Sequence, residues 1–146
     1  MVRRSAQPAK ASDPYLVAIN LTARCNLSCA HCYLDAQKRA TPDGELTFDE
    51  VAGVLSQLAS RAPGTLVVLT GGEPLLHPQL DDLVSFGVGA GLRMVLGTNG
   101  VLLDEARILR LQGMGLAGVG ISIDAVTAAA HDAFRGTPRS FERAVE

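Results

Sequence analysis

Three cysteines, Cys25, Cys29 and Cys32, lie within eight consecutive positions and are the only cysteines among the 146 residues. Cysteine thiolates bind zinc and are the usual ligands of iron–sulfur clusters. An odd number of thiols cannot pair completely into disulfides, and a closed zinc site takes four ligands. Three thiolates on a four-iron cube would leave one iron open to a substrate or cofactor. The spacing therefore indicates a metal site, with an iron–sulfur cluster as the leading interpretation.

Zinc with His31 as a fourth ligand is the alternative. His31 lies between Cys29 and Cys32 and is adjacent to Cys32, whereas structural zinc sites more often take ligand pairs from separated segments. The loop also contains the polar residues Asn26 and Ser28, and Asn26 favours a turn. These polar residues argue against three inert, buried cysteines.

The elements around the cysteines alternate between strand and helix. An unbroken aliphatic and β-branched run at 65–70 is typical of a strand buried on both faces of a parallel sheet. Thr47 and Glu50 form a capping box for a helix, and Asp104 is the expected N-cap of a later one. Another helix is expected from about Pro78. The expected strands cover 15–22, 65–70, 92–98 and 116–124.

The last three strands begin roughly 25 residues apart, which predicts an α/β fold made of repeated βα units with parallel strands. About four units are present, too few to close a (β/α)₈ barrel of about 250 residues. We therefore expect residues 15–146 to be one core domain, a partial TIM-like barrel that is C-terminally truncated. The strand at 116–124 would be an apolar edge, and Ser140 would cap a final helix.

Composition excludes several classes of protein. The chain is 47% hydrophobic and 19% charged, which supports a folded core. A net charge of −2, 4% aromatic residues and no tryptophan argue against a nucleic-acid partner. No apolar run approaches the roughly 20 residues of a membrane span. Residues 1–14 are expected to form a flexible tail without a secretory signal, which favours the cytoplasm, where thiols stay reduced.

The motifs together resemble a known family. A Cys-x₃-Cys-x₂-Cys motif follows the first expected strand, and Gly-Gly-Glu-Pro at 71–74 follows the second. Thr-Asn-Gly at 98–100 and Ser-Ile-Asp at 122–124 follow the third and fourth. This set of motifs, in this order, resembles the radical S-adenosylmethionine (radical SAM) enzymes. The resemblance covers about residues 14 to 146.

The resemblance implies a [4Fe–4S] cluster on Cys25, Cys29 and Cys32, with S-adenosylmethionine (SAM) on the remaining iron. In this family the reduced cluster passes one electron to SAM. Cleavage of SAM then yields methionine and a 5′-deoxyadenosyl radical that abstracts hydrogen from a substrate. An electron donor such as flavodoxin or ferredoxin is implied as a partner. We assign no catalytic side chain beyond the cluster ligands.

The resemblance also implies that Gly71, Gly72, Glu73 and Pro74 bind SAM. The two glycines have no side chains, so their backbone can approach a ligand closely. The carboxylate of Glu73 would accept a hydrogen bond from the SAM ammonium group, and Pro74 biases Glu73 toward an extended backbone. The alternative is an ordinary turn between a strand and a helix.

Four polar residues complete the predicted cofactor site: Thr98, Asn99, Ser122 and Asp124. The resemblance places contacts to SAM or substrate at Thr98 and Asn99, although Asn followed by Gly is also an ordinary turn. Alternation along a strand puts Ser122 and Asp124 on the same side, where they would suit a ribose or the methionine carboxylate. The alternative for Asp124 is the N-cap of the next helix.

Other chemically active side chains receive weaker assignments. His31 stands where the family often has an aromatic residue, and it could pack beside adenine. Tyr33 is expected either on the cluster or in the core. His77 and His131 are expected at the surface. Arg135 is expected to be a solvated surface residue, with a contact to a carboxylate at the pocket mouth as the alternative.

Four glycines are interpreted as helix terminators or tight packing rather than as ligand-binding residues. Gly113, Gly115 and Gly118 spell G-x-G-x-x-G, but they close a helix and precede a strand, the reverse of a dinucleotide fingerprint. Gly136 is expected to end a short helix.

The segment 131–146 resembles the branch of the family that includes heme d1 and alternative heme synthesis, pyrroloquinoline quinone (PQQ) maturation and sulfatase maturation. Members of this branch often carry a C-terminal cysteine-rich (SPASM) extension. The implied substrate is a tetrapyrrole or a peptide, and a molybdopterin-type cyclisation stays open. Two alternatives remain: a non-catalytic zinc- or iron-binding module, and an inactive fragment of such an enzyme. Whether the truncated core alone is active stays open.

Overall fold

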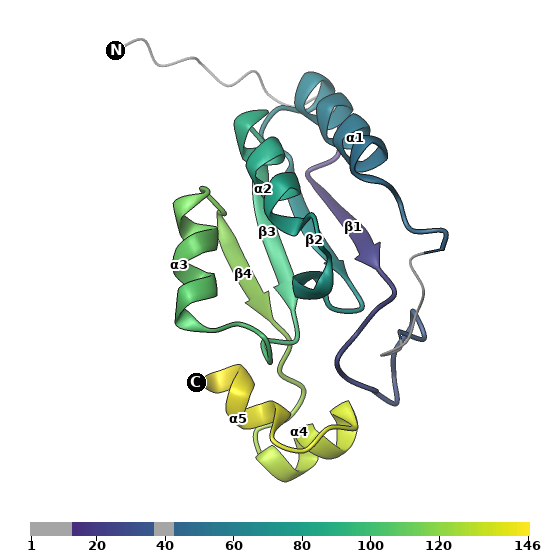
Figure 1. Cartoon of the computed structure of the whole chain (residues 1–146), viewed down its shortest axis with the longest axis vertical. Helices are drawn as coiled ribbons and strands as arrows, with labels where there is room; N and C mark the ends of the chain where they lie inside the picture. The colour runs from purple at the N-terminus through teal and green to yellow at the C-terminus, as the bar shows by residue number, and fades with distance from the viewer. Residues whose placement is uncertain (1–12, 37–42) are drawn as a thin grey trace.

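The computed structural model of the chain describes residues 13–36 and 43–146. Its centre is one four-stranded sheet in which every neighbouring pair of strands is parallel (Figure 1). This confirms the predicted α/β class with four parallel strands. The predicted tail, residues 1–14, falls almost wholly on residues 1–12, outside the described residues. In sheet order, the strands are β1 (Leu16–Thr22), β2 (Leu66–Gly71), β3 (Arg93–Thr98) and β4 (Gly118–Ile121).

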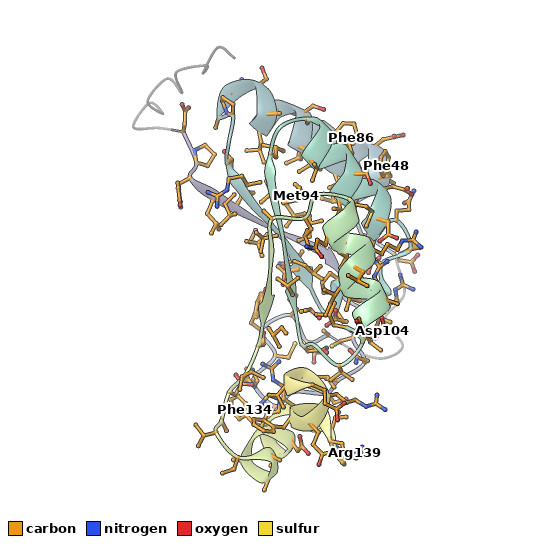
Figure 2. All side chains as sticks on the ribbon, turned by 90° about the vertical axis from the view of Figure 1, so that its left-hand side faces the viewer. Phe48, Phe86, Met94, Asp104, Phe134 and Arg139 are labelled. Carbon is orange, nitrogen blue, oxygen red and sulfur yellow. The ribbon has the colours of Figure 1, made fainter. Side chains whose placement is uncertain are left out.

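Three helices connect the strands and lie on the same face of the sheet (Figure 2). They are α1 (Phe48–Arg61), α2 (Leu80–Gly89) and α3 (Glu105–Gly113). Phe48 of α1 and Phe86 of α2 meet edge to face, with ring centroids 6.1 Å apart. The helix starts are largely as predicted: α1 has the Thr47–Glu50 capping box, and Asp104 caps α3 by accepting a hydrogen bond from the Arg107 N–H.

The start of α2 differs from the prediction. A short 3₁₀ helix, η1 (Pro74–Leu76), follows β2, and α2 begins at Leu80 rather than at Pro78. The backbone N–H of His77 bonds back to the carbonyl of Pro74, so the chain completes one tight turn before the longer helix begins. None of the helices in the described ranges is long and apolar enough to cross a bilayer.

The hydrophobic core lies between the sheet and its three helices. Along β2, Val67 and Leu69 have no exposed surface, and Leu55 of α1 and Met94 of β3 are equally buried. The alternate side chains of β2, such as Val68, are only half-buried. The prediction that the 65–70 run is buried on both faces is therefore wrong, because helices cover only one face. The other face is open and leads to the site described below.

The strand β4 lies at the edge of the sheet and pairs with β3 as its one neighbour among the described residues. It exposes 38% of Val119 and 42% of Ile121. The apolar edge is as predicted, but the strand is shorter than the expected range 116–124. The chain leaves the sheet after Ser122, whose N–H still donates to the carbonyl of Thr98. Two short helices, α4 (Ala128–Arg135) and α5 (Ser140–Val145), follow beyond the carboxyl edge of the sheet (Figure 1), and Arg135 of α4 donates to the carbonyl of Ser122.

The loops at the helix ends follow the glycine predictions, with one correction. Gly115 has φ +87° just after α3, and Gly136 ends α4 in the left-handed conformation with φ +63°. Both glycines therefore terminate helices, as expected. Ser140 is not the N-cap of α5 but its first residue, because its hydroxyl donates to the carboxylate of Asp132 on α4 at 2.8 Å. Arg139 occupies the N-cap position.

Candidate active site

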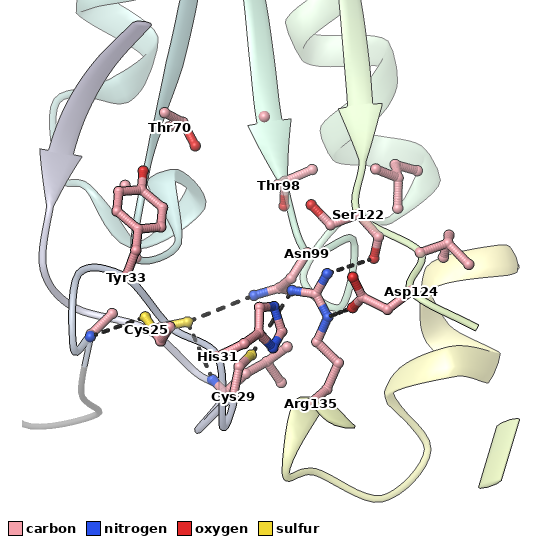
Figure 3. Close-up of a pocket in the computed structure, with 18 residues that line it drawn as sticks. Cys25, Cys29, His31, Tyr33, Thr70, Thr98, Asn99, Ser122, Asp124 and Arg135 are labelled. Carbon is pink, nitrogen blue, oxygen red and sulfur yellow. Dashed lines mark hydrogen bonds and ion pairs between the residues drawn. The ribbon is translucent and has the colours of Figure 1, made fainter. Parts of the chain in front are cut away.

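The carboxyl ends of β2, β3 and β4, the cysteine loop that follows β1, and Arg135 of α4 surround one pocket of about 540 Å³ (Figure 3). In parallel α/β folds this edge is where ligands bind. The pocket brings together nine of the eleven site residues predicted from the sequence. They are Cys25, Cys29, Cys32, Gly71, Gly72, Thr98, Asn99, Ser122 and Asp124. The remaining two, Glu73 and Pro74, are buried behind the pocket wall.

The three cysteines are free thiols, and N–H groups point at their sulfur atoms. The backbone N–H of Leu27 lies 3.4 Å from the Cys25 sulfur, and the N–H of Ala36 lies 3.3 Å from the Cys32 sulfur. Hydrogen bonds to thiolate sulfur stabilise its negative charge and tune iron–sulfur clusters. The backbone therefore supports the charge of two of the three sulfur ligands, Cys25 and Cys32.

Within residues 13–36 and 43–146, no three His, Cys, Asp or Glu side chains converge closely enough to hold one metal ion. A multinuclear cluster has no such requirement, because each thiolate binds a different iron. Burial raises the pKa of Cys25, and the nearby Glu73 carboxylate and the other two cysteines add to this rise. Metal binding at Cys25 would therefore release a proton.

Gly71 and Gly72 hold the start of the cysteine loop against the end of β2. The N–H of Gly72 donates to the carbonyl of Thr22 at 2.7 Å. A Cβ on Gly72 would lie 2.3 Å from the carbonyl oxygen of Arg24, and one on Gly71 would lie 2.6 Å from that of Thr22. Gly71 also has φ +133°, a conformation that L side chains rarely adopt. The backbone at these two glycines therefore does approach a neighbour closely, and that neighbour is the start of the cysteine loop.

Glu73 is placed differently from the prediction. It is 0% exposed, and its carboxylate accepts hydrogen bonds from the Thr98 hydroxyl at 2.7 Å, the Asn99 N–H at 3.0 Å and the Leu75 N–H at 3.1 Å. In the structure, this carboxylate therefore does not face the pocket where the SAM ammonium was expected. It joins the ends of β2 and β3 instead. Its backbone is extended, as predicted from Pro74.

The buried carboxyl of Glu73 makes stability depend on pH. Burial raises its pKa, and the hydrogen bonds from Asn99, Thr98 and Leu75 offset part of this rise. A raised folded pKa means that the native state holds this proton more tightly than the unfolded chain, whose Glu pKa is about 4.3. The stability from this group is therefore complete below about pH 4 and is lost as pH rises through the folded pKa.

The variant Glu73→Gln removes this titration and leaves one mismatched hydrogen bond, at a cost of about 1–3 kcal/mol. We expect the unfolding free energy of the wild type, measured relative to the variant in urea, to be larger at about pH 4 than at about pH 7. If the unfolding free energy of the wild type relative to the variant increased with pH, the three hydrogen bonds would lower the pKa of Glu73 by more than burial raises it.

Asn99 connects the buried carboxylate to the cysteine loop. Its backbone N–H bonds to Glu73, and its side-chain amide donates to Asn26 at 2.8 Å and lies 3.9 Å from the Cys25 sulfur. The next residue, Gly100, has φ +82°, and its N–H donates to the Thr98 hydroxyl. The segment is therefore a turn, and Thr98 and Asn99 also line the pocket, while their contact with SAM or substrate stays a prediction.

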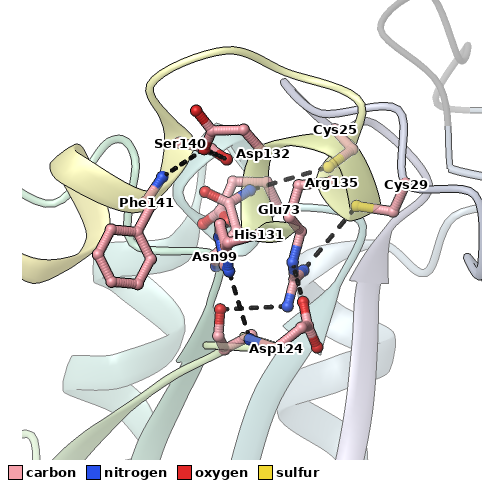
Figure 4. A network of polar contacts seen from close by, with 11 residues as sticks. Cys25, Cys29, Glu73, Asn99, Asp124, His131, Asp132, Arg135, Ser140 and Phe141 are labelled. Carbon is pink, nitrogen blue, oxygen red and sulfur yellow. Dashed lines mark hydrogen bonds and ion pairs between the residues drawn. The ribbon is translucent and has the colours of Figure 1, made fainter. Parts of the chain in front are cut away.

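Asp124 and Arg135 form an ion pair at the pocket wall, with Arg135 Nε 2.5 Å from Asp124 Oδ2 (Figure 4). Arg135 is 8% exposed, so the expected solvated arginine is wrong and the carboxylate contact is correct. His131 is 1% exposed and accepts a hydrogen bond from the Asp124 N–H, so its expected surface position is also wrong. The N-cap of α4 is Thr127, not Asp124.

The remaining predicted side chains lie in three different environments. His31 stacks on Phe134 of α4, with ring centroids 4.0 Å apart and planes at 14°. Tyr33 is 79% exposed at the pocket rim and donates to Asn20, so it is not a core residue. His77 ends η1 in the connection between β2 and α2 and is 8% exposed, and burial lowers its pKa. The expected surface position of His77 is therefore wrong.

Comparison with known proteins agrees with this site. The sequence profile described as the Radical SAM superfamily matches residues 19–146. The chain is 42% identical over 135 residues to the AdoMet-dependent heme synthase of Methanosarcina barkeri, covering 92% of this chain and 38% of that protein. It is 36% identical over 137 residues to the pre-heme d1 synthase of Dinoroseobacter shibae, covering 94% of this chain and 33% of that protein.

Solved structures share the fold. Streptococcus suis SuiB bound to the precursor peptide SuiA superposes with a TM-score of 0.73 at 17% identity, covering 90% of this chain and 29% of that one. The chain thus spans between a quarter and two fifths of the length of these proteins. The profile match extends over most of the described residues, including the whole pocket. The chain therefore belongs to the radical SAM superfamily.

Proposed function

We propose that this chain forms the cluster- and SAM-binding part of a radical SAM enzyme. One observation carries the proposal: three free thiols in the loop after β1 and the carboxyl ends of the parallel strands β2, β3 and β4 line the same pocket. Cys25, Cys29 and Cys32 would hold a [4Fe–4S] cluster. When bound, the cluster and SAM supply the one-electron chemistry that produces the 5′-deoxyadenosyl radical.

The chain's own residues would orient SAM and shield the site. Gly71, Gly72, Thr98 and Ser122 line the pocket wall, where the Ser122 hydroxyl would offer a hydrogen bond to SAM. Glu73 and Pro74 would support this wall from behind rather than bind SAM directly. The three ligands must stay reduced until the cluster binds, so the proposal includes a reducing compartment, the cytoplasm.

We further propose a tetrapyrrole as the substrate class, since both relatives described above are named for heme-type synthesis and exceed 35% identity. A low-potential electron donor such as flavodoxin or ferredoxin would supply the electron. A peptide substrate is the competing outcome. Turnover of a tetrapyrrole with formation of 5′-deoxyadenosine would support the first, and modification of a precursor peptide would support the second.

Anaerobic reconstitution with iron and sulfide tests the proposed function. We expect about four irons and four sulfides per chain, and formation of 5′-deoxyadenosine and methionine when SAM and a strong reductant are added. One tightly held zinc and no cleavage of SAM would instead indicate a non-catalytic metal-binding module. Uptake of the cluster without cleavage would indicate an inactive fragment.

A further inference from the structure

Arg135 is a buried cation that faces the cysteine loop and that the proposed function leaves unused. Its Nη1 atom lies 3.9 Å from the Cys29 sulfur, the range of a long N–H···S contact (Figure 4). The two residues are 106 positions apart in the sequence, and α4 brings them together. A side chain that is 10% exposed thus places a permanent positive charge beside one proposed cluster ligand.

Two further hydrogen bonds hold the Arg135 guanidinium group in this orientation. Its Nε atom bonds to the carboxylate of Asp124, and its Nη2 atom donates to the carbonyl of Ser122 at 3.1 Å. One helical turn earlier, His131 accepts the backbone N–H of Asp124 at 3.3 Å. Helix α4 therefore binds both the side chain and the backbone of the segment that follows β4.

The same end of α4 is fixed to the cysteine loop. The N–H of Ala30 donates to the carbonyl of Phe134 at 3.3 Å, and the Phe134 ring stacks on His31. A Cβ on Gly136 would lie 2.4 Å from the carbonyl oxygen of Ser28. These contacts flank Arg135 on both sides, so its distance from Cys29 is set by the fold.

A charge at this position acts on cluster reduction. Reduction adds one electron and no proton, so it makes the cluster and its ligands one charge more negative. A cation beside a ligand sulfur stabilises the reduced form more than the oxidised form and so raises the midpoint potential. Asp124 carries a negative charge and therefore lowers the midpoint potential. Its effect is smaller, because the guanidinium lies between it and Cys29 (Figure 4).

We propose that Arg135 raises the reduction potential of the cluster through Cys29, and that Asp124 is the counter-ion that orients this guanidinium and limits its effect. The inference rests on the proposed function, because it requires the cluster on the three cysteines. It assigns the Asp124–Arg135 pair to electron transfer into the site. Their direct contact with SAM is not required.

The test is a redox titration of the reconstituted protein without SAM, followed by electron paramagnetic resonance of the reduced cluster. In Arg135→Gln, the ratio of reduced to oxidised cluster at a fixed potential should fall about tenfold, which is about 59 mV for a one-electron couple. In Asp124→Asn, the ratio should rise about threefold. Changes of opposite sign in this ratio indicate an electrostatic effect, since loosening of the fold would change the ratio in the same direction in both variants.

Two further variants serve as controls. Arg135→Lys keeps the charge without the guanidinium fork and should stay within about threefold of the wild type. Arg61→Gln removes the same charge from the exposed end of α1, which leads into the opposite end of β2, and should change the ratio less than about twofold.

Each result decides the inference. Unchanged ratios in Arg135→Gln, with or without weaker SAM binding, would overturn it, as would shifts of the same sign in Arg135→Gln and Asp124→Asn. If Arg135→Gln takes up no cluster, a raised ratio in Asp124→Asn together with a near-normal Arg135→Lys supports the inference, and any other combination overturns it. A wild-type protein that takes up no cluster contradicts the proposed function itself and, with it, this inference.

Discussion

Replacing Cys29 with serine is expected to abolish cluster uptake and SAM cleavage. A serine hydroxyl remains protonated at neutral pH and is a poor ligand for iron in a cluster, which is held by thiolates. Cys29 is half-buried and packs against the small cluster of Cys25, Leu27 and Ala36, apart from the main core, so the unfolding free energy should change by less than about 1 kcal/mol. The measurement is iron and sulfide per chain after anaerobic reconstitution, with 5′-deoxyadenosine quantified by chromatography.

The neighbouring residue provides the matched control. Ser28 is exposed and lies in the same loop between two of the cysteines, so Ser28→Ala should keep both iron content and cleavage within about twofold of the wild type. Normal iron content and cleavage in Cys29→Ser would mean that another side chain completes the ligand set. The assignment of the three cysteines would then be wrong.

Gly72→Ala should be nearly as damaging, although it removes no ligand. The new methyl group would lie 2.3 Å from the carbonyl oxygen and 2.8 Å from the carbonyl carbon of Arg24, so the backbone leading into Cys25 must move. We expect a loss of about 1–3 kcal/mol in unfolding free energy from overpacking. We also expect about a hundredfold slower SAM cleavage, because a shift of about 1 Å in a reacting group can cost this much.

Gly53→Ala is the control for this substitution. Gly53 lies inside α1, and a Cβ there would meet nothing within 4 Å. Alanine should therefore stabilise the protein by about 0.5–1 kcal/mol, as it does in helices generally, and leave cleavage unchanged. If Gly72→Ala behaved like Gly53→Ala, the close contact between the two loops would not exist in solution.

The sequence was sufficient to predict the features that depend on local pattern. Alternating strand and helix signals gave the α/β class and the position of each strand to within a few residues, and the capping box at Thr47 and Glu50 gave the start of α1. Because parallel strands end at one edge of a sheet, the motifs after each strand could also be expected to converge. Nine of the eleven proposed site residues do so.

Glu73 shows where local pattern was insufficient. A carboxylate after two glycines at a strand end suggests a group that faces a ligand. Its actual partners, Thr98 and Asn99, lie 25 and 26 positions later at the end of the next strand. The Thr98 hydroxyl and the Asn99 N–H bind the Glu73 carboxylate behind the pocket wall. Only the register of β2 against β3 determines that placement, and the sequence does not encode register explicitly.

Arg135 and His131 were misjudged for the same reason. Both lie on a short helix rich in alanine, and in isolation each is an ordinary surface residue. One signal was available: the two lie four positions apart and thus share a helix face, next to a strand end that carries Asp124. The partner of Arg135 in the cysteine loop, however, is 106 positions away.

The central claim is that three thiolates of this pocket hold a four-iron cluster and leave one iron for SAM. The most direct measurement is the electron paramagnetic resonance spectrum of the reduced, reconstituted protein before and after SAM is added. The claim predicts about four irons per chain and a spectrum that changes when SAM binds. A spectrum that stays the same at saturating SAM, or zinc as the sole bound metal, would contradict it.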